Sequence, residues 1–76
     1  MEDFAAILRR HRLAAGLTQE GLGERAGLSA RGVQNLERGE RRPYAETTTH
    51  LIAALALEGS ARKEFLEAAR PRPAPP

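Results

Sequence analysis

Three side chains that can make paired hydrogen bonds lie close together in the sequence, at Arg31, Gln34 and Asn35. A guanidinium donates through a planar fork, and a side-chain amide both donates and accepts. In the major groove of DNA the guanidinium fits the edge of guanine and the amide fits adenine, while a small side chain such as Ala30 fits the thymine methyl group. The alternative is that these residues are only the solvated polar face of a surface helix.

Residues suited to binding phosphate flank this group. Arg38, Arg41 and Arg42 form a basic loop that could straddle a nucleic-acid backbone or reach a minor groove, or could be a solvated charged loop. Gln19 lies where a helix is expected to begin, and the free amides and the dipole of that end favour an anion. Ser29 is placed both to cap a helix and to touch a phosphate.

The catalytic and metal-binding patterns that we looked for do not occur. His11 and His50 are distant in the sequence and have no companion ligand nearby, and the chain has no cysteine for a thiolate site or a disulfide. There is no nucleophile with its base, no glycine-rich phosphate loop and no paired-carboxylate site. We therefore expect neither an enzyme nor a bound metal or cofactor, and we expect His11 to pack beside Phe4 and Leu8.

Two helix starts eleven residues apart would position the polar groups. Thr18 and Ser29 are hydroxyl residues that can cap free backbone N–H groups. In each case the apolar residue before the cap lies five positions from another apolar residue, which is hydrophobic-staple spacing. Gly27 lies between the two helices, where a sharp turn requires positive φ. The sequence thus predicts helices over 19–26 and 30–38 that form a helix-turn-helix unit.

Three more helices are expected around this pair, which makes the fold class all-α. The first follows its N-cap Asp3 and stops at Gly16, the fourth covers 46–57, and the fifth follows a Ser60 cap and ends near Arg70. Apolar residues recur at helical spacing in every segment. The expected core faces contain Phe4, Ile7, Leu8, His11, Ala15, Leu22, Ala26, Val33, Leu36, Thr48, Leu51, Ile52, Leu55, Ala61, Phe65, Leu66 and Ala69.

An ordered set of about a dozen positions between Phe4 and Leu57 resembles the phage-repressor-like (Xre/Cro type) DNA-binding domain. The set comprises Gly16-Leu17-Thr18-Gln19-Glu20, Ala26-Gly27-Leu28-Ser29, Val33, Leu36-Glu37-Arg38-Gly39 and Pro43. The resemblance implies a five-helix, lambda-repressor-like bundle built around the helix-turn-helix. It also implies that the helix over 30–38 enters the major groove of DNA.

The resemblance further assigns roles to individual residues. It places base contacts on the first residues of the recognition helix and on those one turn later, which here are Ala30, Arg31, Gln34 and Asn35. It places a phosphate-binding glutamine at Gln19. The remaining candidate phosphate contacts are Ser29, Arg38, Arg41 and Arg42.

Arg12 and Glu37 match a further feature of the family, a partly buried bridge between an arginine of the first helix and a glutamate of the recognition helix. Burying two opposite charges costs about as much as their attraction returns. We therefore interpret this structural ion pair as orienting the recognition helix rather than as adding net stability.

The size and charge of the chain limit the classes of protein to which it can belong. A chain of 76 residues makes one domain and buries only ~60% of its unfolded surface. Its net charge is +2, and eleven of its twelve basic residues are arginine, which suits guanine and phosphate but also arises from codon composition. No apolar run approaches membrane-spanning length and no signal peptide opens the chain, so we expect the cytoplasm.

The proline-rich segment at 71–76 cannot be helical and is interpreted as a tail or linker after a DNA-binding domain at 1–70. Further domains could follow it, or the chain could be a complete small regulator. We expect sequence-specific binding of double-stranded DNA by a bacterial transcriptional regulator.

A homodimer is one possibility, with Phe65 and Leu66 either at its interface or in the core of one copy. The rival function is a helix-turn-helix that holds a protein, such as an antitoxin partner or a tethered sensor, because +2 is a low charge for a DNA-binding domain.

Overall fold

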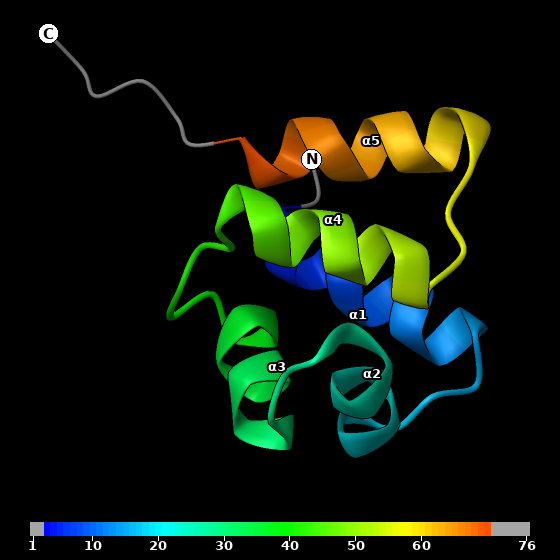
Figure 1. Ribbon diagram of the computed structural model, residues 1–76. Helices are drawn as coiled ribbons and strands as arrows, with labels where there is room; N and C mark the ends of the chain where they lie inside the picture. The colour runs from blue at the N-terminus through cyan, green and yellow to red at the C-terminus, as the bar shows by residue number, and fades with distance from the viewer. Residues whose placement is uncertain (1–2, 71–76) are drawn as a thin grey trace, which may run out of the picture.

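Five helices account for the regular structure of residues 3–70, the part of the chain that the computed structural model describes. They are α1 (Phe4–Ala14), α2 (Gln19–Ala26), α3 (Ala30–Glu37), α4 (Ala45–Ala54) and α5 (Gly59–Ala69). Figure 1 shows α1 and α4 in the middle, α5 along one side and the α2–α3 pair along the other. α5 packs against α1 and α4, while α3 packs against α1 and α2. The predicted all-α, five-helix fold with a helix-turn-helix is confirmed.

Side-chain caps begin the first three helices where the sequence predicts them. Asp3 Oδ1 accepts a hydrogen bond from the Ala6 amide at 3.0 Å. Thr18 Oγ1 and Ser29 Oγ accept from amides in the first turns of α2 and α3, each at 2.9 Å. These bonds satisfy N–H groups that would otherwise have no partner within the helix. Local chemistry therefore defines the start of each of these helices.

Two glycines allow the tight packing of α2 and α3. Gly27 has φ +74° and lies in the left-handed region that the turn between the helices requires. Gly23 approaches the turn so closely that a Cβ atom there would lie 2.5 Å from the Leu28 carbonyl oxygen. A larger residue at Gly23 would therefore push the two helices apart.

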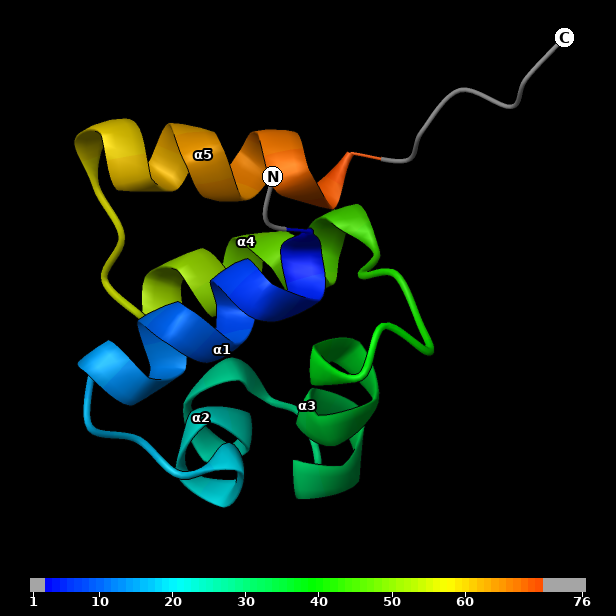
Figure 2. The same cartoon turned by 180° about the vertical axis from the view of Figure 1, so that it is seen from behind.

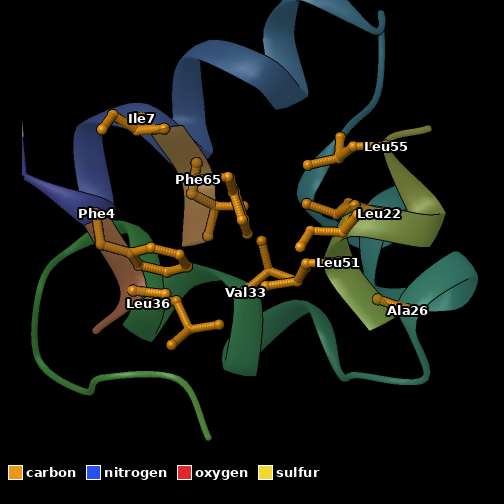
Figure 3. Close-up of a cluster of buried hydrophobic side chains, with 12 residues drawn as sticks. Phe4, Ile7, Leu22, Ala26, Val33, Leu36, Leu51, Leu55 and Phe65 are labelled. Atoms are coloured by element: carbon orange, nitrogen blue, oxygen red, sulfur yellow. The ribbon is translucent and has the colours of Figure 1, made fainter. Parts of the chain in front are cut away.

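The core draws side chains from all five helices (Figure 3). Phe65 of α5 is fully buried and meets Phe4 edge to face, with ring centroids 5.0 Å apart. His11, expected beside Phe4 and Leu8, has its ring 6.2 Å from that of Phe65, and its Nε2 is buried without a hydrogen-bond partner. The buried apolar residues are Phe4, Ile7, Leu8, Leu22, Ala26, Val33, Leu36, Leu51, Ile52, Leu55, Phe65 and Ala69.

The predicted end of the fourth helix is wrong. α4 ends at Ala54 rather than at Leu57, because Ala56 adopts φ +53° and stops the helix. The Leu57 amide donates to the Ile52 carbonyl at 3.0 Å, which is the closing bond of a Schellman motif. This turn places Leu57 against the core. Alanine usually continues a helix, so the sequence contains no glycine that would mark this stop.

Other expected boundaries shift by one or two residues. Ser60 lies inside α5, whose N-cap is Glu58 and has no side-chain capping bond. Arg38 and Ala15 are the C-caps of α3 and α1 rather than helical residues. Thr48, expected in the core, is buried, and its hydroxyl donates to the Tyr44 carbonyl at 3.1 Å.

No helix within residues 3–70 is long and apolar enough to cross a membrane. These residues also contain no group of three or more histidine, cysteine, aspartate or glutamate side chains that could hold a metal ion. The predicted tail at 71–76 lies outside the described residues.

Candidate nucleic-acid interface

The outward side of α3 carries the four residues considered for base contact. Ala30 and Arg31, in its first turn, are exposed, whereas Gln34 and Asn35, one turn later, are half-buried. The other side of the helix is held in the core by the fully buried Val33. In Figures 1 and 2 the first turn of α3 points away from α5, so the carboxy-terminal helix does not cover this side.

The diameter of α3 suits the width of the major groove of DNA. An α-helix with its side chains is about 10–12 Å across, and the major groove of B-form DNA is about 12 Å wide. Such a rod can enter the groove with its amino-terminal end leading. The end that would lead carries Ala30 and Arg31.

Behind α3, Arg12 and Glu37 form a buried two-point ion pair. Arg12 Nε donates to Glu37 Oε2 at 2.6 Å, and Arg12 Nη2 donates to Oε1 at 2.9 Å. The two side chains are only 10% and 4% exposed. Arg12 Nη1 also donates to the Leu17 carbonyl at 2.9 Å. One guanidinium therefore joins α1, the segment before α2 and the last turn of α3.

The bond to Glu37 raises the pKa of the Arg12 guanidinium, and burial offsets part of that rise. The guanidinium is therefore charged at neutral pH. The planar fork matches the carboxylate edge, so the pair also restrains rotation of α3 about its axis.

Gln19 is half-buried at the first position of α2 and reaches the same carboxylate. Its Nε2 donates to Glu37 Oε1 at 3.5 Å, which is the outer limit of a hydrogen bond. Little energy is lost if the side chain turns outward instead. The amino-terminal end of α2 can therefore present an amide side chain to a phosphate, beside free backbone N–H groups.

Ser29 lies at the junction between the turn and α3. It is exposed, and its Oγ accepts the Gly32 amide at 2.9 Å. A hydroxyl that accepts one bond still has its own proton to donate. Ser29 can therefore cap α3 and contact a phosphate oxygen together.

Two of the three arginines that follow α3, Arg38 and Arg41, are exposed and lack strong partners. Arg38 is exposed and lies 3.9 Å from Glu40, with both side chains more than half exposed. An ion pair of this kind contributes little and is easily replaced. Arg41 is also exposed.

Arg42, next to Arg41 in the loop, makes a different contact. Its Nη2 donates to the carbonyl of Arg70, the C-cap of α5, at 2.5 Å and to the carbonyl of Ala68, in the last turn of α5, at 3.4 Å. The sequence predicts that Arg42 contacts a nucleic-acid backbone or minor groove, or lies in a solvated charged loop, and it does not predict this contact with the end of α5.

Two exposed apolar residues were not singled out from the sequence. Tyr44 is the N-cap residue of α4 and is 80% exposed, and Leu13 is 57% exposed. An open surface depression between α1 and the end of α3 is lined in part by Leu13, Arg9 and Arg38. The sequence could have indicated that Tyr44 is exposed, because it follows Pro43 in a basic loop. No local sequence pattern indicated the depression.

The model of a family described as a helix-turn-helix domain matches residues 3–65 of this chain. The match spans α1 to α4 and the first part of α5, and includes every residue of the outward side of α3. No curated protein and no solved structure matches the chain significantly.

Proposed function

Because this chain belongs to the helix-turn-helix domain family, we propose that it binds double-stranded DNA sequence-specifically as part of a bacterial transcriptional regulator. Within that family we assign it to the phage-repressor-like, Xre/Cro type. The observation that carries the proposal is the exposed first turn of α3, with Arg31 outward, on a helix held from behind by Arg12 and Glu37.

In this proposal α3 enters the major groove and reads base edges. Arg31 donates two hydrogen bonds to a guanine, and Gln34 and Asn35 pair with adenines. Ala30 contacts a thymine methyl group. Gln34 and Asn35 are half-buried, and partial burial of a side chain restricts its rotamers.

Phosphate contacts fix the register of the helix on the duplex. We propose that Gln19 and Ser29 bind one backbone strand from the starts of α2 and α3, while Arg38 and Arg41 bind from the loop after α3. Arg42 is left out of this set because its Nη2 donates to carbonyls of α5.

We propose that residues 1–70 form the DNA-binding domain, that residues 71–76 are a proline-rich tail or linker, and that the domain acts in the cytoplasm on the bacterial chromosome. Phe65 completes the core of one copy, and Leu66, 36% exposed, is too small a patch for a stable dimer by itself. Two copies would then meet on half-sites about 34 Å apart through the DNA or through further residues.

Selection of bound duplexes from a random pool tests the proposal. We expect one enriched motif, and we expect Arg31→Ala to weaken binding to it about 10- to 100-fold and to relax one base position. Arg62→Ala is the matched control, because it removes the same charge from an exposed position on α5. Failure to enrich any motif at low salt would reject sequence-specific binding, and failure to bind any duplex at low salt would favour the protein-binding alternative.

A further inference from the structure

The carboxy-terminal end of α5 has no glycine cap. Its C-cap residue, Arg70, is extended, with φ −62° and ψ 135°. The last carbonyl groups of a helix have no partners within it and must be satisfied from elsewhere. The dipole also favours a cation at this end.

Arg42 supplies both the donor and the charge. Its Nη2 reaches the Ala68 and Arg70 carbonyls from positions 26 and 28 residues earlier in the chain. The link therefore joins the loop after α3 to the last turn of α5. Figure 2 shows both segments on the same side of the molecule, with the beginning of α4 between them.

The loop has weak anchors of its own. Residues 39–42 are all exposed, and the pair between Arg38 and Glu40 is 3.9 Å long at the surface. The Glu40 amide donates to the Asn35 carbonyl at 3.1 Å, which ties only the beginning of the loop. A bond from Arg42 to α5 therefore restrains the later half, next to Arg41.

We propose that Arg42 is a positioning residue for DNA binding, whose clamp on the end of α5 holds the loop so that Arg41 faces the DNA backbone. The inference rests on the proposed DNA-binding function. It adds that α5 is coupled to the interface, although α1 and α4 lie between α5 and the α2–α3 pair.

Salt titration of DNA binding separates this role from direct phosphate contact. Neutralising one phosphate contributes about 0.9 to the slope of log affinity against log salt. We expect Arg41→Ala to reduce the slope by about that amount. We expect Arg42→Ala to weaken binding by about 5-fold while leaving the slope at the wild-type value, because Arg41 still meets the phosphate in the complex and only the cost of ordering the loop is added. Arg42→Lys should restore little, because one ammonium group does not reproduce the planar donor geometry.

Amide hydrogen exchange of the free domain gives an independent reading. Arg42→Ala should speed exchange in the last turn of α5, and Arg41→Ala should leave it unchanged. Wild-type affinity in Arg42→Ala, a slope reduced as in Arg41→Ala, or unchanged exchange would each overturn the clamp. If the wild-type chain bound no duplex, the DNA-binding proposal itself would fail and this inference with it, whereas wild-type binding with an inert Arg42 would reject the inference alone.

Discussion

Replacing Arg12 by alanine should destabilise the domain by about 3–5 kcal/mol, because it leaves a buried carboxylate without its counter-ion. Glu37 is 4% exposed and would lose bonds of 2.6 and 2.9 Å. The Leu17 carbonyl would lose its 2.9 Å donor as well. What remains is the 3.5 Å contact from Gln19, which is too long to compensate.

Thermal unfolding followed by circular dichroism measures this loss. In a domain of this size 1 kcal/mol shifts the melting temperature by roughly 4–8 °C, so Arg12→Ala should lower it by more than about 12 °C. Arg31→Ala is the comparison, since it removes an exposed guanidinium and should change stability by less than about 0.5 kcal/mol. Equal melting temperatures for the two variants would refute the reasoning.

Replacing both Arg12 and Glu37 tests whether this buried ion pair adds net stability to the domain. Changing Arg12 and Glu37 together to apolar residues of similar size should cost much less stability than Arg12→Ala alone, since no charge is left unpaired.

The stability that Arg12 contributes should not depend on pH in the neutral range. The pKa of Arg12 is raised, so its contribution is complete below its unfolded pKa and is lost only as pH rises through the folded value. Both values lie far above neutrality.

Two backbone positions give further predictions. Ala56→Gly should stabilise the domain by about 0.5–1 kcal/mol in urea unfolding, because φ +53° strains alanine and not glycine. As a control, Ala53→Gly within α4 should destabilise the domain by about 1 kcal/mol. Gly23→Ala should cost about 1–3 kcal/mol in the same assay, since the new Cβ would lie 2.5 Å from the Leu28 carbonyl oxygen, and a neutral effect would contradict the close approach.

Local signals explain why the helix-turn-helix could be predicted from the sequence. Thr18 and Ser29 are capping residues whose partners lie three positions away, and Gly27 supplies the backbone conformation that the turn needs. Each of these features is complete within a few residues. The same holds for the burial pattern of α3, since the helical period alone separates Val33 from Arg31.

Longer-range features could not be derived in this way. The resemblance paired Arg12 with Glu37, but composition and spacing alone could not, because the partners lie 25 residues apart. The clamp of Arg42 was missed because nothing in the sequence distinguishes it from Arg41. The end of α4 was missed because Ala56 takes a conformation that residue preferences assign to glycine.

The central claim is that the amino-terminal end of α3 is presented outward to a duplex, and chemical-shift mapping tests it most directly. Adding the selected duplex to the labelled domain should shift amide signals at Gln19, Arg31, Asn35 and Arg41, and the shifts should fade as salt rises. Signals from Arg62 and the exposed side of α5 should stay in place. Shifts confined to α5, or none at Arg31 with any duplex at low salt, would contradict the account.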